Sequence, residues 1–266
     1  MERTFETPGA VRLTVKLGSG QIEVEPGLEG RTEVEVVPRN RGAREVVDEM
    51  IVRGDQRGGR FEITIEEPKR GGFVQNLLNN AEFGVKVRCP NDTAVELQTG
   101  SADGVVRGQV ASAHAKTGSG DMSFGEVLGE LVVNTASGDV KAGDIGGDCT
   151  VKTASGDVRV HRVGGDFVGN LVSGDLHLSE AEGPVTVSSV SGDQWIGSIS
   201  RDTRLSAVSG DVRVGVMPGL RLWIDATSVS GDMSSELEAA EPPTADGPIV
   251  ELRAKTVSGD VQIVRA

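Results

Sequence analysis

The feature that most constrains this fold is a Ser-Gly-Asp tripeptide that returns at a fixed interval. Its most regular run is Ser137-Gly138-Asp139, Ser155-Gly156-Asp157, Ser173-Gly174-Asp175, Ser191-Gly192-Asp193 and Ser209-Gly210-Asp211, and Gly118-Ser119-Gly120-Asp121 leads into it. Successive aspartates lie 18 residues apart from Asp103 to Asp211, and the interval then becomes 21 at Asp232 and 28 at Asp260. A fixed interval of this length is the signature of a repeat architecture.

The 18-residue period divides into two halves of nine residues, since Asp148 follows Asp139 by nine and Asp166 follows Asp157 by nine. Each half carries apolar residues at three recurring positions, which we expect to face a shared interior. In one half these are Val140, Ala142 and Ile145; Val158, Val160 and Val163; Leu176, Leu178 and Ala181; and Val212, Val214 and Met217. In the other they are Leu131, Val133 and Ala136; Cys149, Val151 and Ala154; and Val185, Val187 and Val190.

This pattern predicts an all-β fold, a parallel β-solenoid of the β-helix or β-roll kind. Alternating β-branched residues are typical of strands. The Gly-Asp step is a turn signal, because glycine reaches backbone angles closed to other residues and aspartate can bond its own turn. Each coil would hold two strand-turn units, and stacked coils would pair in parallel about 4.8 Å apart. Because crossovers between parallel strands are normally right-handed, we expect a right-handed coil.

The regular repeat divides the chain into two expected parts. Residues 1–90 read as an N-terminal β-rich part with an irregular insertion at about 68–82, and residues 91–266 as the regular solenoid with an excursion loop at about 236–248. Residues 44–50 fit either a short helix or a strand, and residues 54–59 fit a turn between two strands. The last strand, Val261–Val264, is expected to form an open end of the solenoid.

Composition limits the partners and the compartment. The 266 residues carry a net charge of −13 and include 37 glycines. No basic stripe is present to neutralise phosphates, which argues against nucleic acid as a partner. Cys89 and Cys149 are the only cysteines, too few for a disulfide framework, and both are expected to be reduced.

The first residues, from Met1 to Glu6, lack the apolar segment of a signal peptide, and no apolar run approaches the 18 residues of a membrane span. The sequence as it stands therefore predicts a cytoplasmic protein without a transmembrane segment. A chain from which a signal peptide had been removed would read the same.

The sharpest candidate site is a column of carboxylates. In stacked coils, the following aspartates would lie above one another: Asp121, Asp139, Asp157, Asp175, Asp193 and Asp211. A bond from each carboxylate to a turn amide, at about 1.5–3 kcal/mol, would outweigh a repulsion of about 0.6–0.8 kcal/mol per neighbouring pair in water. A purely structural column is thus the favoured interpretation. The alternative is a calcium ladder, because Ca²⁺ prefers carboxylate and carbonyl oxygens.

No catalytic constellation emerges from the sequence. The recurring serines need a base within reach to act as nucleophiles, yet His114, His161 and His177 fall at different phases of the repeat. We therefore predict no enzyme activity, no catalytic residues and no cofactor. A carbohydrate-active enzyme is kept as a minor alternative, because parallel β-helices also serve polysaccharide lyases.

Two stretches of the sequence resemble a known protein family. Pro90 to Ser101 reads Pro-Asn-Asp-Thr-Ala-Val-Glu-Leu-Gln-Thr-Gly-Ser, and Lys152 to Val158 reads Lys-Thr-Ala-Ser-Gly-Asp-Val. Together they resemble the bacterial β-strand-repeat family known as putative adhesins or toast-rack proteins, whose function is unknown. The opening, Thr4 to Gly9, is similar to actinobacterial cytoplasmic members. The resemblance covers nearly the whole chain and implies a parallel β-solenoid without catalytic residues. Some relatives belong to cell-envelope stress systems.

These observations favour a non-enzymatic solenoid scaffold that presents acidic, repetitive faces to a protein partner, in a regulatory or envelope-stress setting. A self-assembling, filament-like solenoid that stacks through its C-terminal end is the alternative.

Overall fold

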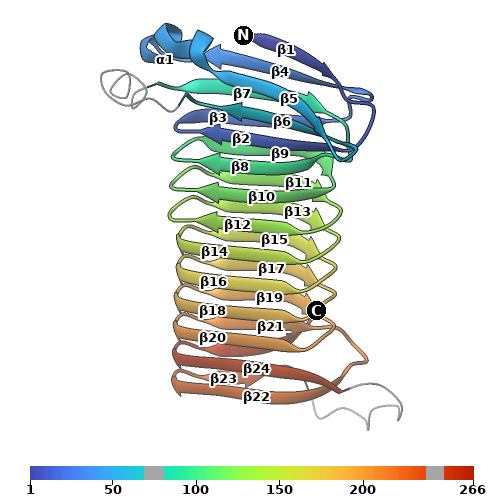
Figure 1. Ribbon diagram of the computed structural model, residues 1–266. Helices are drawn as coiled ribbons and strands as arrows, with labels where there is room; N and C mark the ends of the chain where they lie inside the picture. The colour runs from blue at the N-terminus through green and yellow to red at the C-terminus, as the bar shows by residue number, and fades with distance from the viewer. Residues whose placement is uncertain (69–80, 238–248) are drawn as a thin grey trace. The chain divides into compact units, whose positions relative to one another are not determined.

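The protein is an all-β solenoid of stacked parallel coils (Figure 1). The computed structural model describes residues 1–68, 81–237 and 249–266, without the side chain of Arg57. Strands hold 67% of the residues and helices 4%, which confirms the predicted fold class. The chain forms two compact units, Met1–Asp139 and Val140–Ala266. The predicted irregular insertion and excursion loop lie for the most part outside the described residues, at 69–80 and 238–248.

The first unit consists of two sheets and one short helix. One sheet has the order β1 (Glu2–Glu6), β4 (Arg31–Pro38), β7 (Phe83–Cys89), β3 (Gly20–Pro26), β9 (Asp103–Val110) and β11 (Met122–Val127). The other has the order β5 (Ile51–Arg57), β6 (Arg60–Glu66), β2 (Val11–Leu17), β8 (Ala94–Thr99), β10 (Ser112–Thr117) and β12 (Leu131–Thr135). Helix α1 (Arg41–Val46) continues into a 3-10 turn, η1 (Val47–Glu49).

The N-terminal part of this unit departs from a uniform parallel stack. β4 pairs antiparallel with both β1 and β7, and β5 pairs antiparallel with β6. Residues 44–50, predicted to be either a helix or a strand, are helical through Glu49: they cover the end of α1 and the 3-10 turn η1. At the start of α1, the Ala43 amide donates to the Asn40 side chain at 2.9 Å. Asparagine at this position satisfies an amide that the first helical turn leaves unpaired. The turn predicted at residues 54–59 is shorter than expected, because β5 runs to Arg57 and only Gly58 and Gly59 form the connection.

The second unit repeats the 18-residue coil. Its first sheet has the order β13 (Val140–Ile145), β15 (Val158–Val163), β17 (Leu176–Ala181), β19 (Gln194–Ile199), β21 (Val212–Val216), β25 (Val261–Arg265) and β23 (Met233–Ser235). Its second sheet has the order β14 (Cys149–Ser155), β16 (Phe167–Ser173), β18 (Val185–Ser191), β20 (Thr203–Ser209), β24 (Ile249–Ser258) and β22 (Arg221–Ser230). Val140 pairs with Val158, and Val158 with Leu176, so the predicted period is the true register.

Alternation along the strands places most of the predicted interior residues correctly. Val158, Val160 and Val163 are all buried, as are the equivalent residues of β13 and β17. The third position of the other half was predicted wrongly at Ala136, Ala154 and Val190, which are exposed. There the residue one place earlier is buried: Thr135, Thr153 or Ser189. Met217 is likewise exposed, and Val216 takes the interior place.

Polar interior residues at these corners have a clear role. The Thr117 hydroxyl accepts the amide of Gly120 at 2.9 Å, and the Thr135 hydroxyl accepts the amide of Gly138 at 2.9 Å. A buried amide without a partner costs free energy comparable to a lost hydrogen bond. A threonine directed inward therefore stabilises the turn more than an apolar residue would, and the apolar residue that follows points to solvent.

At the end of the second unit the coils do not follow chain order. β25 lies between β21 and β23, and β24 lies between β20 and β22. The prediction that Val261–Val264 forms the open end is therefore wrong. Ile263 is buried within that sheet, and β22 and β23, which precede β24 and β25 in the chain, form the outermost coil of this unit (Figure 1).

Both cysteines lie in the interior as free thiols. Burial raises the pKa of Cys149 to about 12 and that of Cys89 to about 11. Because only the thiolate reacts with disulfide reagents, we expect both thiols to react with DTNB at pH 8 roughly a hundredfold or more slowly than a free cysteine. Stopped-flow absorbance would check this, with urea-unfolded protein as the fast control. Prompt reaction of either thiol in the folded protein would contradict its burial.

Among the described ranges, the structure contains no helix that is both long and apolar enough to cross a bilayer.

Candidate interaction surface

The aspartates of the repeat form a hydrogen-bonded ladder. In the first unit, Asp103 Oδ1 accepts the amide of Asp121 at 3.0 Å, and Asp121 Oδ1 accepts that of Asp139 at 2.9 Å. In the second unit the same bond, at 2.8–3.1 Å, links each aspartate to the amide of the next in the order Asp157, Asp175, Asp193, Asp211, Asp260 and Asp232. Each such carboxylate thus uses one oxygen to hold the neighbouring coil.

The opposite corner has a shorter version of this ladder. Asp148 Oδ1 accepts the amide of Asp166 at 2.9 Å, and Asp202 Oδ1 accepts the amide of Glu251 at 2.9 Å. Both corners of the second unit therefore carry carboxylates that bond from one coil to the next.

This bonding predicts acid sensitivity at Asp157. Its pKa is held below the ordinary value, first by the Asp175 amide and further by Arg159, whose Nη2 lies 2.8 Å from Oδ2. A depressed folded-state pKa gives stability that is present above the unfolded pKa of about 4 and is lost as the pH falls through the folded value. We expect the urea concentration at the unfolding midpoint of the wild type to decrease once the pH is lowered past about 4. The midpoint of Asp157→Asn should decrease less. Parallel acid profiles would contradict this.

Within the described residues, no three His, Cys, Asp or Glu side chains gather in a way that could hold a metal ion. The ladder spaces its carboxylates along the stack, one from each coil, rather than converging them on a point. A structural column without a metal stays the prediction, and calcium binding by the six aspartates stays its alternative.

The serines and histidines lie in separate places. Ser173, Ser191 and Ser209 are exposed at the corner. His161 Nδ1, on β15, lies 2.6 Å from Asp144 Oδ1, on the neighbouring β13, and His177 stacks on Trp195 with ring centroids 3.7 Å apart. In the first unit, His114 Nε2 lies 3.3 Å from Glu130. Each histidine thus has a partner other than a serine, and no described contact builds a serine nucleophile.

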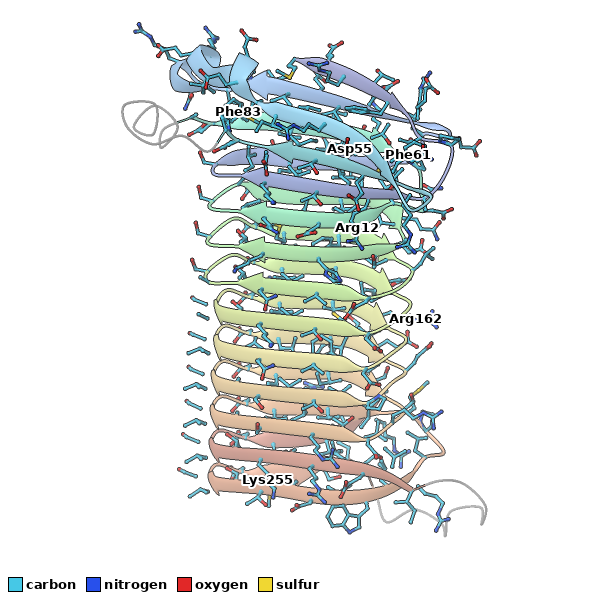
Figure 2. The ribbon with its side chains drawn as sticks, viewed as in Figure 1. Arg12, Asp55, Phe61, Phe83, Arg162 and Lys255 are labelled. Atoms are coloured by element: carbon cyan, nitrogen blue, oxygen red, sulfur yellow. The ribbon has the colours of Figure 1, made fainter. Side chains whose placement is uncertain are left out.

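A column of exposed valines, which the sequence analysis missed, runs along the Ser-Gly-Asp corner of the second unit. Its members, named here the valine ridge, are Val172, Val190, Val208, Val257 and Val229 in spatial order. Their exposed fractions range from 50% to 76%. Paired strands lie about 4.8 Å apart, so the ridge is continuous. Figure 2 shows the regular column of short side chains along this corner. The signal is present in the sequence as the repeated Val-Ser-Gly-Asp, of which the interior pattern includes only Val190.

The flat sheet faces of the second unit are not uniformly acidic. The outer face of the first sheet carries one column of Lys141, Arg159, His177, Trp195 and Arg213. A neighbouring column brings together Arg162 and Glu180, and Figure 2 shows Arg162 projecting outward. On the other sheet, Lys255 lies 3.3 Å from Asp225. The regular line of carboxylates in this unit lies at the Ser-Gly-Asp corner, beside the valine ridge.

The first unit offers a different surface, a shallow depression of about 260 Å³ next to β1, β4 and β7. Two of its lining cations are ion-paired, with Lys86 Nζ 2.9 Å from Glu25 and Arg88 Nη1 3.2 Å from Glu33. Nearby, the hydrogen bond from Arg107 holds the pKa of Glu23 below its ordinary value. These ion pairs neutralise Lys86 and Arg88, the two cations that β7 contributes to the depression.

Three solved structures are similar to this chain to different degrees. A putative lipid binding protein from Parabacteroides distasonis is 15% identical, with a TM-score of 0.54, covering 100% of this chain and 96% of that one. A putative adhesin from Bacteroides fragilis is 11% identical, with a TM-score of 0.47, covering 99% and 96%. A putative adhesin from Parabacteroides distasonis is 12% identical, with a TM-score of 0.41 and the same coverage. At these identities the first of the three shows a shared fold alone.

The chain matches none of the curated proteins. The family comparison is decisive, because the model of the Toastrack family, DUF4097, matches residues 10–264. That range takes in the strands of both units from β2 to β25, including the aspartate ladders and the valine ridge. The predicted resemblance is confirmed: the chain belongs to the Toastrack family.

Proposed function

We propose that the protein is a non-enzymatic scaffold that binds an extended protein partner along the Ser-Gly-Asp corner of its second unit. The observation that carries this proposal is the valine ridge. Isolated exposed valines are ordinary on protein surfaces, whereas a contiguous apolar strip rimmed by polar residues marks an interaction site.

The chemistry of the corner specifies the partner. Each valine of the ridge is followed by a serine and, two residues later, by an aspartate of the ladder, as in Val190-Ser191-Gly192-Asp193. An apolar strip thus runs beside a line of carboxylates with the same spacing. A segment with apolar residues along one side and lysine or arginine beside them complements both columns. Apolar burial would supply affinity, and the carboxylates would orient the segment and speed its association.

Repetition explains why this corner suits a scaffold. The same Val-Ser-Gly-Asp unit recurs on successive coils, so one partner could bind at several neighbouring places or several partners could line up. Linked contacts raise overall affinity without any single strong contact. This supports a binding role, and among the described residues no serine–histidine contact supports hydrolysis.

Affinity capture with a matched pair of variants tests the proposal. The ridge variant carries Val172→Ser, Val190→Ser and Val208→Ser. The control carries Lys141→Ser, Arg213→Ser and Gln262→Ser on the outer face of the other sheet, where all three are exposed. Immobilised wild type and both variants are incubated with lysate of the source bacterium, and bound proteins are identified by mass spectrometry at low and high salt.

A protein retained by the wild type and the control, lost by the ridge variant and released by salt would support the proposal. Equal retention by all three would overturn the corner as the binding surface. Loss in the control alone would move the site to the flat sheet face. Relatives in cell-envelope stress systems make lysates from envelope-stressed cells a second sample.

A further inference from the structure

In the described part of the second unit, the last coil has one side that pairs with no strand. β22 and β23 are each the last strand of their sheet. Leu222, Ile224 and Ala226 continue the columns of Val250, Leu252 and Ala254, which are buried in β24. In β22 the same columns are partly or largely exposed, and Ile224 is 39% exposed. The apolar interior of the solenoid therefore reaches solvent at this end.

The edge of β22 lacks the usual protection against strand pairing. Natural edge strands are kept short or carry lysine, proline or a bulge. β22 is ten residues long, contains neither lysine nor proline, and pairs with β24 in an uninterrupted register from Arg221 to Ala226 and beyond. In the described part of the unit, the outer side of β22 therefore presents backbone N–H and C=O groups that could pair with another strand.

We propose that a second copy of this chain occupies this end, with the two β22 strands paired antiparallel about a two-fold axis. Identical strands can pair in this way because each supplies the same edge to the other. A two-fold contact uses one surface on both copies, so it closes at a dimer instead of growing into a filament. This goes beyond the proposed partner binding, which runs along the whole corner and shares only the last corner, with Val229 and Asp232, with this contact.

Side-chain alternation restricts the register. Residues that face each other across the axis must point to the same side of the sheet, so the axis has to pass through a residue. An axis at Asp225 would set two carboxylates opposite each other, which is destabilising. An axis at Ala226 sets two alanines opposite each other and brings Trp223 of one copy opposite Val229 of the other. Ile224 then faces Ser228 on the inner side.

This register joins the two most exposed apolar residues of β22. Val229 is 76% exposed and Trp223 is 48% exposed. Trp223 is held from one side by Arg253, whose guanidinium carbon lies 5.5 Å from the ring centroid. Aromatic and β-branched residues paired across strands each contribute roughly 0.2–1 kcal/mol. Two such pairs form in the dimer.

Charge complementarity supports the same register. It brings Arg221 of one copy opposite Gly231 of the other, next to Asp232. Asp232 is the last member of its ladder: its amide donates to Asp260 Oδ1 at 2.8 Å, and in the described part of the unit no further coil offers an amide to its own carboxylate. The guanidinium of Arg221 from the other copy can donate to the Asp232 carboxylate instead, and this contact forms twice, once on each side of the axis.

Sedimentation velocity of the full chain between about 1 and 100 µM tests this inference. Wild type is expected to shift from monomer to dimer across that range. Val229→Asp should weaken the dimer roughly tenfold or more, because it breaks the contact with Trp223. Val190→Asp is the matched control, since it changes an equally placed ridge residue away from the end and should leave dimerisation unchanged.

A charge exchange makes the test specific. Arg221→Asp and Asp232→Arg should each weaken the dimer roughly tenfold, and the double variant should restore it. Recovery in the double variant would support the register directly. A wild type that stays monomeric throughout, a dimer insensitive to Val229→Asp and to both charge changes, or species larger than a dimer would each overturn the proposal. Loss of a lysate partner by the ridge variant, with dimerisation unaffected, would separate this inference from the proposed function.

Discussion

Gly192→Ala is expected to lower the free energy of unfolding of the second unit by about 3 kcal/mol or more. Gly192 lies at a Ser-Gly-Asp corner with φ of +125°, and a Cβ added there would lie 2.1 Å from the Gly174 carbonyl oxygen of the adjoining coil. An L-residue is thus both strained by the backbone angle and in collision with a backbone atom. Since the atom in the way is backbone, no side chain can move aside, and two coils would have to separate.

Gly219→Ala is the matched control for this effect. Gly219 also has a positive φ, of +85°, but an added Cβ would have no atom within 4 Å. It should cost only about 1 kcal/mol, which is the backbone strain without the collision. Urea unfolding followed by tryptophan fluorescence measures the difference, because both tryptophans, Trp195 and Trp223, belong to the second unit. Equal losses in the two variants would show that close approach of the coils plays no part.

Phe167→Ala is expected to cost about 3–5 kcal/mol. Phe167 is among the largest fully buried side chains, at 1% exposure, in an interior filled mostly by valine, leucine and isoleucine. Its ring fits because position 169, two residues along β16, is glycine: a Cβ there would lie 3.1 Å from Phe167 Cε1. Truncation of the ring would leave a cavity between two closely packed sheets that cannot collapse without disturbing their hydrogen bonds.

The same contact provides a compensating change. Gly169→Val should destabilise the wild type, where the ring occupies the space. In the Phe167→Ala background it should instead recover part of the loss, about 1–2 kcal/mol, by filling the cavity. Urea denaturation of all four proteins would give the coupling between the two positions. Additive effects would mean that the ring and Gly169 do not share this space.

The repeat made the fold of this protein readable from its sequence. The 18-residue spacing of the aspartates and the alternation of Val158, Val160 and Val163 predict strand positions, register and interior correctly. The physical reason is that every coil must place the same kind of residue above the same neighbour. The aspartate ladder was readable for the same reason, because a carboxylate next to a turn amide at each corner satisfies both groups.

The missed features depend on interactions that no local pattern carries. Val190 was assigned to the interior because it is apolar, whereas the turn prefers Ser189 inside, where its hydroxyl accepts the side-chain amide of Gln194 at 2.8 Å. The order of the final coils was missed because Val229-Ser230-Gly231-Asp232 and Val257-Ser258-Gly259-Asp260 read alike. Either corner could lie outermost, and only the packing of the whole end decides between them.

That inverted order has a mechanical consequence for the chain's C-terminus. Repeat arrays ordinarily lose their end units one after another, because each touches only its neighbours. Here β25 is held by β21 on one side and β23 on the other, and the Ala266 amide donates to the Val216 carbonyl at 3.0 Å. A pulling force applied at Ala266 must remove β25 from between β21 and β23. Both rows of backbone hydrogen bonds, to β21 and to β23, bear this force together. β25 thus holds β23, and with it the outermost coil of this unit, in place.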